Sequence, residues 1–350
     1  IADCFSCQRV KEHVETQYGN MHCIMTGTRK ANRPVILTFH DIGLNHKSCF
    51  ETLFNHMDMQ EITRQLPVCH VEAPGQHVGA KTLPNAYTYP SMDQLSEALP
   101  AVLSHFGVIG LGVGAGAYIL ARFALNHPDL VDGLVLININ PNSEGLMHTV
   151  ANKITEWTHT LPDQVIAHLF GKHEIQTNHD LIATYRHHIS VTMNQSNVSQ
   201  FFRSYNNRNT LEVERPVPGG NINVRTLKCA TLLVVGDNSP AVEVVVDCNA
   251  KLNPTNTTLL KVAGRTKHHK ECKTLSSASM TRLRSRTTSS SSFLSFDGSR
   301  SRSHTNELQH GQTHSDEKRG RTRHNTDVSM ESISNSNVDQ IISKSTEVAC

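Results

Sequence analysis

The sequence has few aromatic residues, almost no excess of either charge and no long hydrophobic run. Only 5% of its 350 residues are aromatic and 37% are hydrophobic, below the roughly 45–50% usual for a chain that is globular throughout. Part of the chain is therefore expected to stay unfolded. The formal net charge of +2 argues against nucleic-acid binding, which normally needs a strong basic excess. No hydrophobic run approaches the roughly 18 residues of a membrane-spanning helix, so a membrane span is excluded.

Disulfides, targeting signals and metal motifs are also missing. The nine cysteines are odd in number and irregularly spaced, unlike a disulfide framework, which predicts a reducing, cytosolic compartment. Residues 1–19 contain neither the basic nor the apolar run of a signal peptide. Cys4-Phe5-Ser6-Cys7 has the spacing of half a zinc site, but no second pair follows. We therefore expect no metal and no cofactor.

The composition changes sharply at Gly264. Before it, apolar runs alternate with amphipathic segments, and after it Ser, Thr, Arg, His and Asn dominate. A segment with so few large apolar residues cannot offset the entropy lost on ordering. We predict an irregular N-terminal segment at 1–19, a folded domain at 20–264 and a disordered Ser/Arg-rich tail at 265–350.

Strand and helix patterns alternate within the folded domain. Apolar runs predict strands at 34–39, 66–71, 108–111, 134–139, 231–235 and 257–262, and helical spacing predicts helices at 91–105, 118–125 and 240–252. This order is typical of a mostly parallel sheet with both faces covered. Residues 142–225 interrupt it with amphipathic stretches at 154–169 and 181–189. We expect them to form a helical cap at the edge of the sheet where ligands bind.

A glycine-rich segment, Gly112-Val113-Gly114-Ala115-Gly116, follows one strand and opens a helix. A dinucleotide-binding loop would need G-x-G-x-x-G early in the fold, and neither the spacing nor the position fits. The nucleophile elbow G-x-S-x-G of α/β-hydrolases fits in both respects. Gly114 then stands where the serine should be. Because glycine supplies no oxygen, this interpretation predicts an elbow without a nucleophile.

The acid and the histidine of a hydrolase should follow in that order. Ser239 occupies the usual position of the acid, just after the strand at 231–235. Asp237 is either a displaced acid or, more simply, the cap of the following helix. His268 and His269 follow the last strand without a glycine turn to orient them. In a chain with 22 histidines, we interpret this pair as chance.

The loop after the first predicted strand completes the candidate pocket. His40 and Asp41 stand where hydrolases of this fold place the oxyanion-hole loop, and they either anchor the turn or bind a ligand. An altered hydrolase that uses Asp237 with His40 or His70 is the alternative, but it needs a nucleophile that the elbow lacks. We predict no catalytic residue, and degenerate positions at Gly114 and Ser239. The residues expected around the pocket are His40, Asp41, Gly112, Gly114 and Asp237.

Long runs of the sequence carry a family resemblance. They are residues 40–47, 58–63, 68–76, 89–93, 112–120, 122–128 and 232–242. These runs resemble the NDRG (N-myc downstream-regulated) family over about residues 13–264, and the resemblance resumes at 277–283. The tail segment 300–305 (RSRSHT) is similar to the repeat of the founding member. The resemblance implies an α/β-hydrolase fold without hydrolase activity, in cytosolic proteins that act through partners in signalling and trafficking.

The chain departs from the family pattern in three places. Residues 1–10 do not resemble the family's start, and the link at 106–108 is short. Residues 265–275 (RTKHHKECKTL) replace a glycine turn and a final helix that cover the sheet. Exposing a few hundred Å² of apolar sheet would cost several kcal/mol at about 25 cal/mol per Å². We therefore expect the departure after Gly264 to weaken the domain.

The tail carries four R-x-R-x-x-[ST] motifs. Basophilic kinases of the AGC type recognise this pattern because two arginines meet acidic subsites beside the acceptor. The candidate acceptors are Thr287, Ser289, Thr305 and Thr326. Each phosphate adds about −1.5 to −2 charge, so full modification would remove the positive character of the tail. The alternatives are an uncommitted solvated tail and a tail that binds an anionic membrane surface, at about 1 kcal/mol per basic residue.

Together these patterns predict a non-enzymatic adaptor with a kinase-regulated tail. The resemblance implies roles in stress response, differentiation, growth control and vesicle trafficking, with cytosolic signalling and trafficking proteins as partners and no nucleic acid. We expect it in the cytoplasm, with pools at membrane surfaces or in the nucleus. The alternatives are an altered hydrolase and a binder of phosphoinositides or the membrane surface.

Overall fold

The structure is a computed structural model of the chain. It describes residues 9–28, 33–103, 107–143, 160–221, 223–263 and 345–349. The chain divides into two units, Ile1–Ser289 with Ser343–Cys350 and, separately, Ser290–Ile342. The second unit lies wholly outside the described residues, so the fold described below is that of the first.

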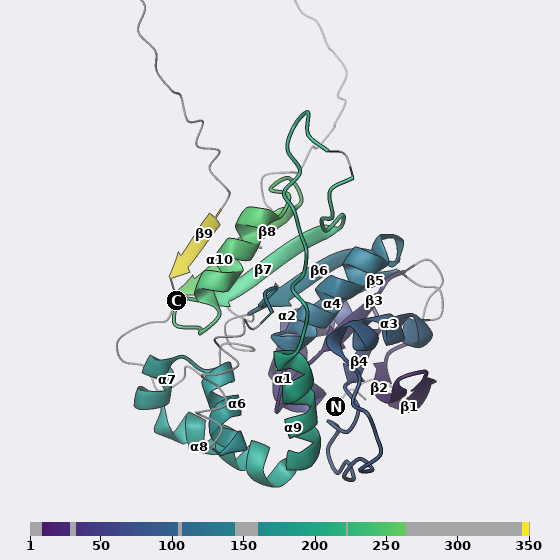
Figure 1. Ribbon diagram of the computed structural model, residues 1–350, viewed down its shortest axis with the longest axis vertical. Coiled ribbons are helices and arrows are strands. Elements are labelled where there is room, and N and C mark those ends of the chain that lie inside the picture. Colours follow the sequence, from purple (N-terminus) through teal and green to yellow (C-terminus); the bar gives the residue numbers. More distant parts are fainter. Residues whose placement is uncertain are drawn as a thin grey trace, which may run out of the picture. The chain divides into compact units, whose positions relative to one another are not determined.

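Nine strands among the described residues form one sheet, in the order β1-β2-β4-β3-β5-β6-β7-β8-β9 (Figure 1). Its strands are β1 (Arg9–Thr16), β2 (Gly19–Thr26), β3 (Val35–Phe39), β4 (Val68–Glu72), β5 (Val108–Val113), β6 (Val131–Ile137), β7 (Ala230–Gly236), β8 (Thr257–Ala263) and β9 (Ser345–Ala349). β2 pairs antiparallel with β1 and β4, and the other pairs are parallel. The sheet is thus mostly parallel, as the alternation of strands and helices predicts.

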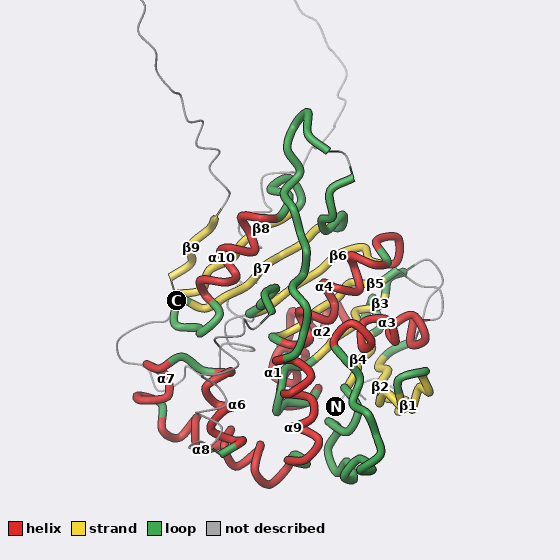
Figure 2. The backbone as a smooth tube through the Cα atoms, in the orientation of Figure 1, coloured by secondary structure: helices red, strands yellow, loops and turns green. Residues whose placement is uncertain are grey.

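The helices fall into a set that covers the sheet and a set that forms the cap. The covering helices are α1 (His46–Phe54), α2 (Met57–Thr63), α3 (Met92–Leu103), α4 (Ala115–Asn126), the 3₁₀ turn η1 (Pro128–Leu130) and α10 (Val242–Lys251). The cap holds α6 (Leu161–Leu169), α7 (Lys172–Thr177), α8 (His179–His187), the π-helical turn η2 (His188–Thr192) and α9 (Gln195–Asn206). Figure 2 shows the cap helices grouped beyond one end of the sheet. None of the helices described is both long and apolar enough to cross a membrane.

Each face of the sheet buries its own hydrophobic cluster, because neighbouring side chains on a strand point to opposite faces. On β7, Leu233 and Val235 belong to the cluster that includes α3, α4 and α10. Val234, between them, belongs to the cluster beneath α1. The apolar runs without alternation therefore reflect strands that are buried on both faces.

The predicted irregular segment at 1–19 is wrong for Arg9–Thr16. These residues form β1, an edge strand that makes an antiparallel hairpin with β2. Gly19, with φ +116°, starts the second strand of this hairpin. The sequence of β1 (RVKEHVET) has too few apolar residues to predict a strand. It is held by backbone pairing with β2, which local hydrophobicity does not report.

The predicted disordered tail at 265–350 is wrong for Ser345–Ala349. These residues form β9, which pairs in parallel with β8 from Leu259↔Ser345 to Ala263↔Ala349. The open edge of β8 supplies the backbone partners for this short segment, and local composition cannot show such a long-range pairing. The rest of the tail lies outside the described residues, as do all four candidate phosphorylation sites.

Candidate functional site

The elbow is the tight turn at Gly114, between the end of β5 and the start of α4. Gly114 has φ +53° and ψ −111°, in a left-handed region that glycine adopts without steric cost. A Cβ on Gly112 would press against the backbone of Ala117, and one on Gly116 would overlap the backbone of Phe39. The flanking glycines thus let the helix start close to the sheet. A hydrogen atom stands where a nucleophilic side chain would project.

A carboxylate fills the space in front of this elbow. Asp41 follows β3, and its Oδ1 accepts hydrogen bonds from the backbone N–H groups of Ile42 (2.8 Å) and Ala115 (2.9 Å). In α/β-hydrolases, N–H groups of the residue after the nucleophile and of this loop form the oxyanion hole. The Asp41 side chain therefore lies in the oxyanion hole of this fold. A Cβ on Gly114 would overlap the same carboxylate.

The cap supplies a third partner for Asp41. His168, near the end of α6, donates from Nε2 to Asp41 Oδ1 at 2.9 Å, and its ring packs edge-on against Tyr205 of α9. Burial alone would raise the pKa of Asp41, which is 4% exposed. The charge and hydrogen bond of His168, together with the two N–H donors, outweigh burial and hold this pKa below its ordinary value. Asp41 is thus ionised and connects the cap to the sheet.

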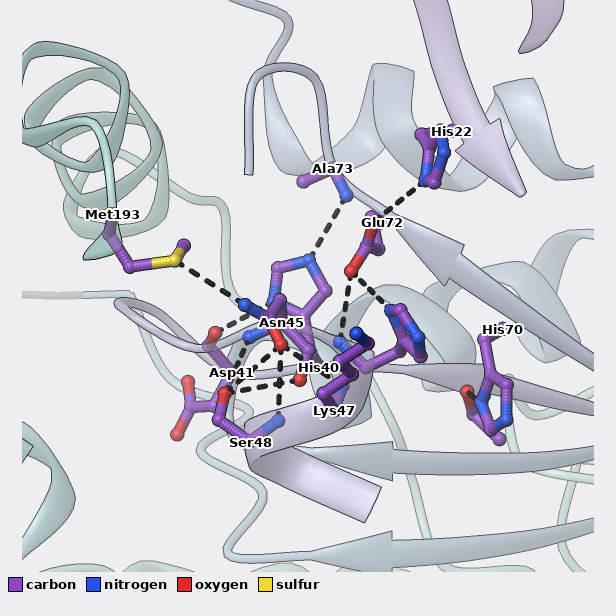
Figure 3. Close-up of polar contacts among 12 residues, drawn as sticks. His22, His40, Asp41, Asn45, Lys47, Ser48, His70, Glu72, Ala73 and Met193 are labelled. Atoms are coloured by element: carbon purple, nitrogen blue, oxygen red, sulfur yellow. Dashed lines mark hydrogen bonds and ion pairs between the residues drawn. The ribbon is translucent and has the colours of Figure 1, made fainter. Parts of the chain in front are cut away.

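His40 is held as a neutral ring. Its Nε2 accepts from the backbone N–H of Ala73 at 3.1 Å, so the proton is on Nδ1, which donates to the carbonyl of Asp41 at 2.8 Å (Figure 3). Burial lowers the pKa of His40 below its ordinary value. Both ring nitrogens are engaged by backbone, and the geometry favours the turn-anchoring interpretation over ligand binding.

The residues between β7 and α10 include both candidates for the acid position, Ser239 and Asp237. Ser239 donates through Oγ to Asn138 Oδ1 at 3.1 Å, and the same oxygen accepts from the N–H of Ala241. Asp237 is exposed at the end of β7. Burial, together with the nearby charge of Asp237, raises the pKa of Glu174 on α7. The N-cap of α10 is Ala241, so the prediction that Asp237 caps this helix is wrong.

A second polar cluster surrounds Glu72 at the end of β4. Glu72 is fully buried and accepts from His22 Nδ1 at 2.8 Å and from His46 Nδ1 at 2.6 Å (Figure 3). The ring of His77 stacks on His22 at 4.8 Å. Burial works to raise the pKa of Glu72, but the two histidine hydrogen bonds hold it well below its ordinary value. In the part of the chain that the structure describes, no group of His, Cys, Asp and Glu is arranged to hold a metal ion.

The structure brings together His40, Asp41, Gly112 and Gly114, which the sequence places on one loop and one turn. It adds His168, which sequence reasoning missed. His168 is one of 22 histidines and stands in the cap, before the acid position rather than after it. No local signal distinguishes it, because its partner Asp41 is 127 residues away.

Comparison with known proteins assigns the chain to a family. The sequence model of the Ndr family matches residues 11–275. The chain belongs to the Ndr family. Protein NDRG1 of Xenopus tropicalis is 62% identical over 257 residues, covering 72% of this chain and 65% of the relative. Protein NDRG4-A of Xenopus laevis is 51% identical over 313 residues, covering 83% of this chain and 80% of the relative. The chain thus spans 65% of the length of the NDRG1 relative.

Solved structures show the same fold in this Ndr-family chain. A thermophilic esterase from Thermogutta terrifontis aligns with a TM-score of 0.54 at 14% identity, covering 81% of this chain and 97% of the esterase. An enol-lactonase from Burkholderia xenovorans aligns with a TM-score of 0.53 at 14% identity, covering 81% of this chain and 99% of the lactonase. The fold is therefore that of an α/β-hydrolase. At such low identity the likeness extends to the fold alone.

Proposed function

We propose that this Ndr-family chain is a non-enzymatic adaptor built on an α/β-hydrolase fold. One observation carries the proposal: the ionised Asp41 carboxylate lies in the oxyanion hole, beside an elbow that has Gly114 at the nucleophile position. A hydrolase stabilises the negative charge of its transition state with those N–H groups. Here an internal negative charge already occupies them, and it would also repel an oxyanion.

The other groups of the site support the same proposal. His40 has both ring nitrogens engaged by backbone, so it has no free lone pair for a general base. His168 is bound to Asp41, and Ser239, at the acid position, is engaged by Asn138 and Ala241. Removing any member of a catalytic triad costs most of the rate. An altered hydrolase remains the second candidate. His70, one of the two histidines expected to serve it, is hydrogen-bonded to Thr38 at 2.7 Å, so the base that we propose for this candidate is the Asp41–His168 pair.

We also propose how the adaptor is regulated and which class of proteins it binds. Family membership and the four R-x-R-x-x-[ST] motifs of the tail support regulation by basophilic AGC-type kinases at Thr287, Ser289, Thr305 and Thr326. The partners we propose are cytosolic signalling and trafficking proteins in stress response, differentiation, growth control and vesicle trafficking. The proposed location is the cytoplasm, with pools at membrane surfaces or in the nucleus. Binding of the basic tail to phosphoinositides or another anionic surface is the competing role.

A fluorophosphonate probe tests the absence of hydrolase chemistry. The chain should not be labelled, whereas an active serine esterase of the same fold, treated in parallel, should be. The same samples should show p-nitrophenyl acetate hydrolysis no faster than the chain carrying His168→Gln. Labelling that maps to the elbow, or turnover abolished by His168→Gln, would favour the altered hydrolase.

Vesicle flotation separates the two roles of the tail. Vesicles with and without phosphatidylserine and phosphoinositide are mixed with the chain before and after AGC-kinase treatment. A surface-binding tail should float with anionic vesicles and lose binding on phosphorylation, because each phosphate offsets about two basic charges. A variant with alanine at the four acceptors is the control. Equal flotation of both forms would exclude charge as the switch.

A further inference from the structure

A groove lies between α9, the start of α3 and the loop that leads into α3. Its volume is about 550 Å³, within the range of roughly 300–1,000 Å³ that small-ligand sites occupy. Figure 1 shows the loop after β4 passing beside α9. The groove contains none of the elbow residues, since its described lining comes from residues 84–94 and 200–207. It is therefore a separate feature of the surface.

Side-chain hydrogen bonds connect the two walls of the groove. Asn197 of α9 is fully buried, and its Nδ2 donates to the carbonyls of Gly75 (3.1 Å) and Lys81 (2.9 Å). Its Oδ1 accepts from the N–H of Leu83 at 2.9 Å. Ser204 of α9 also donates to the carbonyl of Pro90 at 2.7 Å. The loop is thus held against α9, and the groove exists before any ligand arrives.

The polar side chains in the groove are available for a ligand. Asn85, Gln200, Asn207 and Arg203 make no side-chain hydrogen bond or ion pair with any other residue of the described part. A carboxamide has both a donor and an acceptor, which match the C=O and N–H of a peptide group. No acidic residue is among the described residues that line the groove. The Arg203 guanidinium is therefore an uncompensated positive charge.

Two tyrosines present ring surface to the groove. The hydroxyl of Tyr87 donates to the carbonyl of Tyr18, and that of Tyr89 donates to the carbonyl of Pro74, both at 3.0 Å. The rings meet edge to face at 6.1 Å. Because both hydroxyl groups are already engaged, the rings provide apolar contact area in fixed orientations.

We infer that this groove binds an extended peptide segment of a partner protein that carries an acidic side chain. The carboxamides of Asn85, Gln200 and Asn207 pair with the peptide backbone. The tyrosine rings pack against its apolar atoms, and Arg203 binds the carboxylate of Glu or Asp or the phosphate of a modified Ser or Thr. The inference rests in part on the adaptor role, since it specifies the chemistry of the partner.

Fluorescence polarisation with labelled octapeptide pools tests the inference on the full chain. Each pool has one fixed central residue, Glu, phosphoserine, Gln or Lys, between randomised positions. The Glu or phosphoserine pool should bind about tenfold more tightly than the Gln pool, as expected for one charge-assisted hydrogen bond, and the Lys pool most weakly. The better of the two acidic pools identifies the source of the charge.

Three variants locate the binding. Arg203→Glu should abolish the preference for acidic pools and favour the Lys pool, whereas Arg64→Glu, an exposed control at the C-cap of α2, should change nothing. Gln200→Ala with Asn207→Ala should weaken all four pools by a similar factor, because these carboxamides contact backbone. Circular dichroism and thermal melts confirm that each variant is folded.

Several results would overturn the peptide site. They are no binding of any pool at millimolar protein, equal binding of the Glu and Lys pools, or the same effect from Arg203→Glu and Arg64→Glu. Glucuronate or inorganic phosphate that displaces the peptide at its own affinity would instead show a small-anion site. None of these results bears on the elbow, whose chemistry the fluorophosphonate probe measures separately, so the peptide site and the non-enzymatic role can fail independently.

Discussion

Asp41 occupies the backbone N–H groups beside the elbow. The two N–H groups that would bind an oxyanion instead bind its carboxylate, and His168 donates a hydrogen bond to the same carboxylate. This arrangement needs a residue without a side chain at the elbow, because a Cβ on Gly114 would overlap Asp41. The occupied N–H groups and the glycine are therefore two parts of one arrangement. Introducing a serine at position 114 alone should not produce hydrolase chemistry.

Gly114→Ser tests this dependence. We expect a loss of at least about 1 kcal/mol in the free energy of unfolding, from the left-handed backbone and the overlap with Asp41, and no gain in p-nitrophenyl ester turnover. Gly79→Ser is the matched control, because Gly79 has φ +75° and open space around its Cβ position. Gly79→Ser should lower the free energy of unfolding only by the cost of placing a side chain on a left-handed backbone. Turnover by Gly114→Ser well above the parent would reveal a hidden base and reopen the hydrolase alternative.

A double-mutant cycle measures the bond between Asp41 and His168. Asp41→Asn and His168→Gln should each destabilise the chain by about 2 kcal/mol, and their coupling energy should be about 1–3 kcal/mol, because Asp41 is buried and His168 is half-buried. The more solvent-accessible pair His56–Asp58, 3.8 Å apart, is the control, and its coupling should be close to zero. Urea denaturation of all variants gives the energies. Equal coupling energies for both pairs would show that the Asp41–His168 bond does not stabilise the contact between the cap and the sheet.

Polar side chains also connect elements that are far apart in the sequence. Glu72, at the end of β4, binds His22 of β2 and His46 at the start of α1. Asn197 connects α9 to the loop after β4. A buried group with several hydrogen bonds costs its full desolvation when its partners are lost. Such residues therefore determine how the hairpin and the cap loop are oriented on the sheet.

The stabilisation by Glu72 should depend on pH. Its pKa in the folded chain lies well below the ordinary value of 4.5, so the unfolded chain takes up the proton first as the pH falls. The contribution is complete above about pH 4.5 and is lost progressively below it. Glu72→Gln should therefore cost about 3 kcal/mol at pH 7, and less at pH 3–4. Urea midpoints across this range measure the change, with the exposed Glu61→Gln as control. A constant difference between pH 7 and pH 3 would contradict the prediction.

At the scale of the whole molecule, the two ends of the described chain lie at the two edges of the sheet. β1 forms one edge and β9 the other. A strand edge with unpaired N–H and C=O groups promotes association between molecules. β9 pairs with β8 from Leu259 to Ala263. The C-terminal segment therefore protects the edge that β8 would otherwise expose.

Replacing Ser345–Ala349 with a Gly-Ser linker of equal length tests this role. We expect a melting temperature lower by a few degrees, since each kcal/mol shifts it by about 2–4 °C in a domain of this size. We also expect concentration-dependent association through the β8 edge in analytical ultracentrifugation. The control is the same replacement at residues 330–334, which lie in the other unit of the chain. If the two variants behave alike, β9 does not protect the sheet.

Much of the fold and the elbow follows from the sequence alone. Apolar runs predict the buried strands from β3 to β8, because a strand covered on both faces must be apolar along its length. The glycine spacing around Gly114 predicts the elbow, since a tight turn needs residues without a Cβ. The absence of an oxygen at Gly114 and of an acid at Ser239 is also read directly from the residue types. These features are local, and each is determined by a few consecutive residues.

Only the tertiary structure decided which distant groups meet. His168 contacts Asp41 across 127 residues, β9 pairs with β8 across 86 residues, and β1 becomes a strand through pairing with β2. Hydrophobic patterns report which face of an element is buried. They do not indicate which polar side chain will contact that face, because this depends on how distant segments of the chain pack together. The oxyanion hole filled by Asp41 is a property of the folded chain for this reason.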